Sequence, residues 1–105
     1  MKVDFFIVGA PKAGTTSLYH YLNQHPGIEM SRIKEPNFFS SKSLKESGTY
    51  YNSTIVDDYE DYHLLFNSKN KEVLFGEASV SYLFYNDVAN NIKKYNPSSK
   101  IIIVL

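Results

Sequence analysis

A short apolar run that ends in a turn rich in glycine is the feature that most constrains this chain. Residues 3–8 are almost wholly apolar, and Gly9-Ala10-Pro11-Lys12-Ala13-Gly14 follows at once. Thr15-Thr16-Ser17 comes next, and hydroxyl residues of this kind favour the start of a helix. A continuous apolar run is typical of a strand buried on both faces of a parallel sheet. The pattern therefore predicts a strand, a tight loop and a helix that ends near Gln24.

The rest of the chain alternates between strand-like and helix-like segments. We expect strands at 28–30, 73–75 and 101–105, helices over 57–66 and 79–95, and a loop over 40–56. The buried faces of the first and last helices are expected to hold Leu18, Tyr21 and Leu22, and Phe84, Val88, Ile92 and Tyr95, respectively. Strands that alternate with helices are typical of an α/β domain with a parallel sheet. The 105 residues suffice for one such domain with a single core.

The turn after the first strand has the properties of a phosphate-binding loop. Successive amides in such a turn can face one concavity, and the following helix N-terminus adds partial positive charge. Lys12 adds a full positive charge, and Gly14 permits a ligand to approach the backbone closely. We therefore predict a phosphate site formed by Lys12, Ala13, Gly14, Thr15, Thr16 and Ser17.

The loop differs from the Walker A pattern of P-loop proteins. Gly9 and Gly14 have the spacing of its two glycines, but Thr15 stands at the lysine position and the lysine lies at residue 12. No apolar strand ends in an aspartate that could hold magnesium. This combination favours a nucleotide whose phosphate is the leaving group. A P-loop kinase or NTPase is the alternative, and a non-catalytic phosphate-binding fragment is a third reading.

Composition argues against several other classes of function. Eleven Lys and Arg balance eleven Asp and Glu, whereas nucleic-acid and anionic-membrane binders need a basic excess. The chain has no Cys, which excludes a thiolate nucleophile and Cys-ligated zinc. Its three His lack metal-ligand spacing, so no metal is expected. The first apolar run is too short for a signal peptide and no stretch has the length of a membrane span, so we expect a cytoplasmic protein.

Three ordered blocks resemble the sulfotransferases that use 3′-phosphoadenosine 5′-phosphosulfate (PAPS). F-I-V-G-A-P-K-A-G-T-T-S-L at 6–18 is similar to their 5′-phosphosulfate loop, H-P-G-I-E-M-S-R-I-K-E-P-N-F-F at 25–39 to a second block, and G-E-A-S-V-S-Y-L at 76–83 to a third. The branch most resembled is the heparan-sulfate-type and related bacterial group. The resemblance implies a fold like that of P-loop NTPases. It also implies that residues 1–105 are the N-terminal part of a single sulfotransferase domain, cut before the motif that binds the 3′-phosphate.

The resemblance implies roles for individual residues. Lys12 matches the lysine that stabilises charge on the departing phosphate, and residues 14–17 match the donors around that phosphate. Glu35 matches the glutamate that acts as general base, because an acceptor hydroxyl or amine must lose its proton as it attacks sulfur. The implied reaction transfers a sulfuryl group from PAPS to a small-molecule or carbohydrate acceptor without a metal.

Several further side chains have open roles. Lys34 either orients an anionic acceptor or is exposed, and Glu77 could face a cleft at the end of its strand. Tyr50 and Tyr51 are the best candidates to line an acceptor cleft, because their segment is otherwise polar. Ser79 and Ser81 are expected to cap the helix that follows them.

Overall fold

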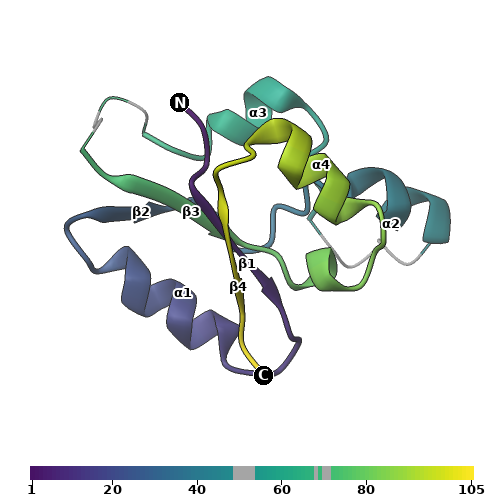
Figure 1. Cartoon of the computed structure of the whole chain (residues 1–105), viewed down its shortest axis with the longest axis horizontal. Helices are drawn as coiled ribbons and strands as arrows, with labels where there is room; N and C mark the ends of the chain where they lie inside the picture. Colours follow the sequence, from purple (N-terminus) through teal and green to yellow (C-terminus); the bar gives the residue numbers. More distant parts are fainter. Residues whose placement is uncertain (49–53, 68, 70–71) are drawn as a thin grey trace.

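A parallel sheet forms the centre of the computed structural model, which describes residues 1–48, 54–67, 69 and 72–105 (Figure 1). Its four strands run in the order β2-β3-β1-β4 and all pairs are parallel. The strands are β1 (Phe5–Gly9), β2 (Ile28–Met30), β3 (Leu74–Ala78) and β4 (Lys100–Ile103). The α/β fold with a parallel sheet is therefore confirmed.

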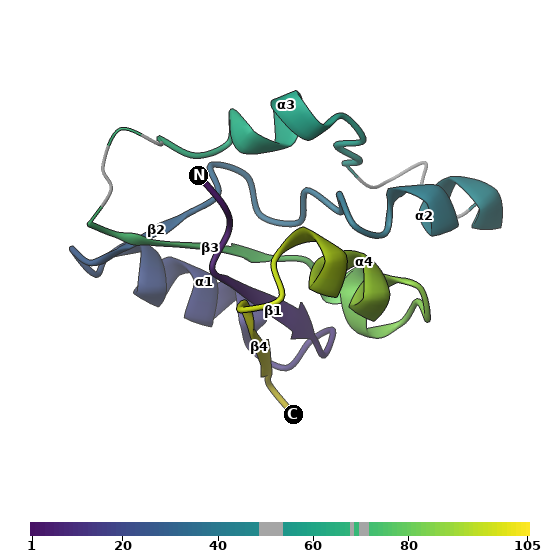
Figure 2. The ribbon, with the colours of Figure 1, turned by 45° about the horizontal axis from the view of Figure 1, so that its top comes forward.

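Helices cover both faces of the sheet (Figure 2). One face carries α1 (Thr15–Asn23). The other face carries α2 (Ser41–Ser47), α3 (Tyr59–His63), the 3₁₀ helix η1 (Val80–Leu83) and α4 (Val88–Tyr95). This three-layer arrangement buries the central strands from both sides.

Strand β1 supplies side chains to two apolar clusters. Phe6 and Val8 pack with residues of α3, η1 and α4, whereas Phe5 and Ile7 pack with Tyr19 of α1. Every residue of β1 is buried, because alternate side chains point to opposite faces and both faces are covered. The continuous apolar run in the sequence reflects this double burial.

The first predicted helix is confirmed, but one residue of its predicted buried face is wrong. Tyr21 is 72% exposed, and Tyr19 is buried in its place. Tyr19 packs beside Met30 of β2, and its hydroxyl donates a hydrogen bond to the carbonyl of Ser31. Leu18 and Leu22 pack against the same cluster, as predicted.

The predicted loop over 40–56 is wrong in its first half, where α2 forms. This helix buries only Leu44 and ends at Gly48, whose φ of 70° suits a glycine C-cap. Ser43 Oγ donates to Asp87 Oδ1 at 2.9 Å, so a tertiary contact helps to hold it. The helix predicted over 57–66 is present as the shorter α3, with Asp58 as its N-cap.

The helix predicted over 79–95 is divided into η1 and α4. Val88, Ile92 and Tyr95 are buried as predicted, but Phe84 lies between the two helices and is 79% exposed. Ser79 occupies the N-cap position of η1 but makes no side-chain cap hydrogen bond, and Ser81 lies within η1. Both hydroxyls donate to other side chains described below.

Candidate functional site

Three sequence-distant segments meet where the parallel strands end. The loop that joins β1 to α1 leaves this edge, residues 31–39 leave β2, and residues 79–83 leave β3. Backbone hydrogen bonds tie them together: Glu35 N–H donates to the Ala78 carbonyl at 2.8 Å and Ser79 N–H to the Ile7 carbonyl at 3.0 Å. This edge is where ligands bind in α/β sheets with parallel strands.

The loop after β1 is held at its base and open at its tip. Ala10 N–H donates to the Val104 carbonyl at 2.8 Å, and Val104 N–H donates to the Gly9 carbonyl at 2.9 Å. Lys12, at the tip, is exposed and has a φ of 63°. The segment after β4 therefore fixes the start of the loop, while the Lys12 ammonium stays accessible.

The N-terminus of α1 is open to an anion. Gly14 is the N-cap with a φ of 91°, and no side chain caps the helix. The position of a Gly14 Cβ meets nothing within 4 Å, so there is open space before the first amides of the helix. These amides have no acceptor in a preceding turn, and they carry the positive end of the helix dipole. Thr16 and Ser17 are exposed beside them, whereas Thr15 is buried.

Glu35 is an accessible carboxylate with a fixed orientation. Its Oε1 accepts a hydrogen bond from Val80 N–H at 3.1 Å and pairs with Lys34 Nζ at 3.2 Å. The Glu35 side chain is 34% exposed. The side chain of Lys34 therefore lies against that of Glu35.

One cavity brings the loop and Glu35 together. It has a volume of about 250 Å³, and its lining includes Pro11 of the loop, Glu35 and Asn37 after β2, and Ser81 after β3. Pro11 of the loop therefore lines this cavity together with Glu35, whereas the predicted phosphate-binding residues 12–17 do not line it. Tyr50 and Tyr51, predicted to line an acceptor cleft, lie outside the described residues.

Glu77 is fully buried and does not face this cavity. Tyr62 Oη and Tyr82 Oη donate to its Oε2 at 2.6 and 2.7 Å, and Ser79 Oγ donates to its Oε1 at 2.7 Å. Burial raises the pKa of Glu77 to about 7, although the three hydroxyl hydrogen bonds oppose that shift. The prediction that Glu77 faces a cleft is wrong, because its strand turns this side chain into the core beside α3 and η1.

Sequence reasoning did not single out Asn37, which links the segments at this edge. Its Nδ2 donates to the Glu35 carbonyl at 3.0 Å and to the Thr54 carbonyl at 2.8 Å. Its Oδ1 accepts from Ser81 Oγ at 2.6 Å. Asn37 has a φ of 56°, a left-handed conformation that asparagine adopts more readily than most residues. Nothing in the neighbouring sequence indicates that conformation.

His63 of α3 contacts two tyrosine residues. His63 Nε2 lies 2.7 Å from Tyr95 Oη and its Nδ1 lies 2.8 Å from the Tyr59 carbonyl, and burial lowers the pKa of His63. Within the described part of the chain, no three His, Asp or Glu side chains come together as a metal site. No helix in that part has the length and apolar character to cross a membrane.

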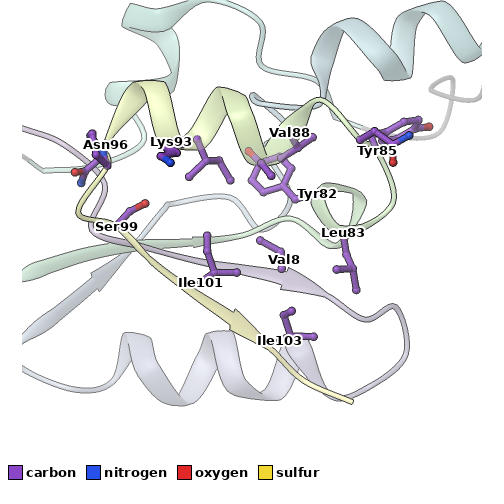
Figure 3. Close-up of a pocket in the computed structure, with 14 residues that line it drawn as sticks. Val8, Tyr82, Leu83, Tyr85, Val88, Lys93, Asn96, Ser99, Ile101 and Ile103 are labelled. Carbon is purple, nitrogen blue, oxygen red and sulfur yellow. The ribbon is translucent and has the colours of Figure 1, made fainter.

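A second cavity, of about 490 Å³, lies between α4 and β4 (Figure 3). Ile101 and Ile103 of β4 line one side of it and Val88 of α4 the other. Neither Lys12, Gly14 nor Glu35 lines it. This cavity, whose lining also includes Lys93, Asn96 and Ser99, therefore lies apart from the candidate site.

Comparison with known proteins assigns the chain to a family. No family model matches it. It is 33% identical over 103 residues to mouse carbohydrate sulfotransferase 15, in a match that spans 79% of this chain and 18% of that protein. It is 29% identical over 101 residues to human bifunctional heparan sulfate N-deacetylase/N-sulfotransferase 3, across 96% of this chain and 11% of that protein.

A solved structure supports the same assignment. The crystal structure of a sulfotransferase from Alicyclobacillus acidocaldarius superposes with a TM-score of 0.81 and 39% sequence identity, over 98% of this chain and 44% of that one. The chain thus spans less than half the length of these relatives. Its parallel sheet, its open loop and these matches together show that the chain belongs to the sulfotransferase family.

Proposed function

We propose that this chain carries the donor loop and the general base of a sulfotransferase that uses PAPS and a carbohydrate acceptor. One observation carries this proposal: Pro11 of the open loop and the Glu35 carboxylate line the same cavity of about 250 Å³. The names of the relatives support a carbohydrate acceptor, since one is a carbohydrate sulfotransferase and another a heparan sulfate N-sulfotransferase.

The residues of the loop fit the phosphosulfate end of the donor. The uncapped N-terminus of α1 and the open space at Gly14 suit a phosphate group, and the exposed Lys12 ammonium supplies a full positive charge. Thr16 and Ser17 offer hydroxyl donors, and the buried Thr15 offers its amide. When bound, PAPS supplies the sulfuryl group and leaves as adenosine 3′,5′-bisphosphate. Lys12 and the helix amides stabilise the negative charge that develops on the leaving phosphate.

Glu35 is placed to remove the proton of the acceptor. A carboxylate within hydrogen-bond reach of a hydroxyl or amine can take its proton as that group attacks sulfur. The Val80 amide holds Oε1 of Glu35, and Glu35 lines the cavity. Lys34 Nζ lies 3.2 Å from the same oxygen.

Calorimetry with adenosine 3′,5′-bisphosphate tests the donor site. Lys12→Ala is expected to weaken binding about tenfold or more, because it removes a charge-assisted contact to phosphate. Lys94→Ala is the matched control: it removes an exposed lysine of α4 and is expected to leave the dissociation constant within about twofold. Equal binding by Lys12→Ala and the parent would overturn the assignment of the loop.

A transfer assay tests the reaction itself. The full-length protein is incubated with radiolabelled PAPS and fully desulfated heparin, which offers both hydroxyl and amine groups. The expected result is label on the polysaccharide, without added magnesium. Magnesium-dependent ATP or GTP turnover with no sulfuryl transfer would instead support a P-loop kinase or NTPase.

A further inference from the structure

We propose that Glu77 is a positioning residue for Glu35: its buried carboxylate orients the hydroxyls of Ser79 and Tyr82, which in turn hold the backbone that presents the base. This inference rests on the proposed function for the role of Glu35. Glu77 itself is fully buried and does not line the cavity beside the donor loop.

The burial of Glu77 calls for an explanation. Its side chain has no exposed surface, and a buried carboxylate destabilises a fold unless hydrogen bonds compensate for lost water. Three hydroxyls supply those bonds. The reaction described above makes no direct use of Glu77, so its role must lie in what these hydroxyls contact next.

Two of the three hydroxyls continue to the segment that follows β2. Ser79 Oγ accepts from Asn37 N–H at 3.1 Å, and Tyr82 Oη accepts from Phe39 N–H at 3.2 Å. Above pH 7, where Glu77 is ionised in the native state, its carboxylate can only accept hydrogen bonds. Glu77 therefore draws the hydrogen of each hydroxyl to itself, and the lone pairs of both oxygens face the backbone amides of residues 37 and 39.

That segment needs support because its backbone is strained. Glu35 has a φ of 62° and Asn37 a φ of 56°, and this left-handed region is unfavourable for residues other than glycine. Asn37 Nδ2 donates to the carbonyl of Glu35 at 3.0 Å, which couples the two residues directly. The path from Glu77 through Ser79 and Asn37 therefore ends on the residue that carries the base.

Tyr62 provides a matched comparison with Tyr82. Both hydroxyls donate to the same oxygen of Glu77, at 2.6 and 2.7 Å, so either Phe variant removes one donor from the carboxylate. Of these two tyrosines, within the described part of the chain, Tyr82 alone also accepts from the backbone of 37–39, at Phe39 N–H. The ring of Tyr62 stacks on Phe38 at 4.4 Å, and Tyr62→Phe keeps that ring.

Amide hydrogen exchange, measured by NMR on the full chain, tests the positioning role of Glu77 without any ligand. We expect Glu77→Gln and Tyr82→Phe to speed exchange at Phe39 about tenfold relative to the amides of α4, and Tyr62→Phe to change it by less than about threefold. Should Glu77→Gln fail to fold, the two tyrosine variants still decide the question. Equal exchange at Phe39 in Tyr62→Phe and Tyr82→Phe overturns the positioning role and makes Glu77 a part of the core alone.

Kinetics on the same variants connect positioning to the reaction. Glu77→Gln and Tyr82→Phe are expected to lower kcat about tenfold, with KM for PAPS and binding of adenosine 3′,5′-bisphosphate within about twofold. A loss caused by unfolding would lower binding and kcat together, which would overturn the inference. Failure of the proposed function is distinct, because it shows as parent-like nucleotide binding by Lys12→Ala, whatever the exchange at Phe39.

Discussion

The carboxylate of Glu35 accepts a hydrogen bond from the backbone amide of Val80, which lies 45 residues further along the chain, at 3.1 Å. Val80 begins η1, directly after the segment that continues β3. The orientation of Glu35 is therefore set in part by a residue that follows the neighbouring strand β3, and not by its own loop alone. Substitutions on either side of this contact test different parts of the site.

Glu35→Gln separates proton transfer from donor binding. The amide keeps the size of the side chain and can still accept from Val80 N–H, but it cannot take a proton. We expect transfer from radiolabelled PAPS to fall by about two to four orders of magnitude, with binding of adenosine 3′,5′-bisphosphate nearly unchanged. Glu46→Gln, on the exposed surface of α2, is the control and should match the parent. Undiminished turnover in Glu35→Gln would remove Glu35 from the reaction.

Gly14→Ala tests the open N-terminus of α1. A φ of 91° strains an alanine by about 1 kcal/mol, and its methyl group would occupy the space before the helix amides. We expect both a lower free energy of unfolding and about tenfold weaker nucleotide binding by calorimetry. Gly48→Ala is the control, since Gly48 has a φ of 70°, equally open surroundings and a place at the end of α2. It should lose similar stability and bind the nucleotide like the parent; matching binding losses would refute the proposal.

Gly76→Ala should disrupt the sheet. A Cβ at Gly76 would lie 2.2 Å from Cζ of the Phe5 ring, which is buried between β3 and α1. We expect a loss of about 3 kcal/mol or more in the free energy of unfolding, measured by urea denaturation. Adding Phe5→Leu should recover part of that loss because it removes the clash. Gly27→Ala, whose Cβ would meet only the ring of exposed His25, should cost less than about 1 kcal/mol.

Glu77 should make stability depend on pH. Burial raises its pKa from 4.5 to about 7, so between these values the native state holds a proton that the unfolded state releases. Its contribution to the free energy of unfolding is complete below pH 4.5 and falls by about 3 kcal/mol as the pH rises to 7. Glu77→Gln cannot titrate, so urea denaturation of both proteins between about pH 5 and pH 8 isolates this contribution. The parent should lose stability relative to the variant as pH rises, and a constant difference would contradict the assigned shift.

The central elements could be predicted from the sequence because strong local signals specify them. The apolar run at β1 and the turn residues after it predict a buried strand, a loop and a helix. The loop then lies at the carboxyl edge of the sheet. The positions of Lys12 and Glu35 near this edge follow from the same order of elements. The resemblance predicts that the loop and Glu35 lie close together, and Pro11 of the loop lines one cavity with Glu35, although Lys12 does not line it.

The elements that were missed depend on tertiary contacts. Helix α2 is polar and buries only Leu44, so it has no periodic pattern to detect. The break between η1 and α4 leaves Phe84 exposed although its spacing matches the buried residues of α4. The sequence suggests Glu77 as a cleft residue because it lies near the end of a strand. Only the packed structure shows that two tyrosines and a serine surround it.

The strand order carries a consequence for how this architecture diversifies. Strand β3 separates β1 from β2, and neighbouring strands lie about 4.8 Å apart, so the backbones that lead to the donor loop and to the base leave the sheet about 10 Å from each other. The loop after β1 and the segment that carries Glu35 are thus attached to two different strands of one sheet. Under the proposed function, substitutions within 31–39 would alter the acceptor side of the site while the loop after β1 keeps its place in the sheet, so one scaffold could serve different acceptors.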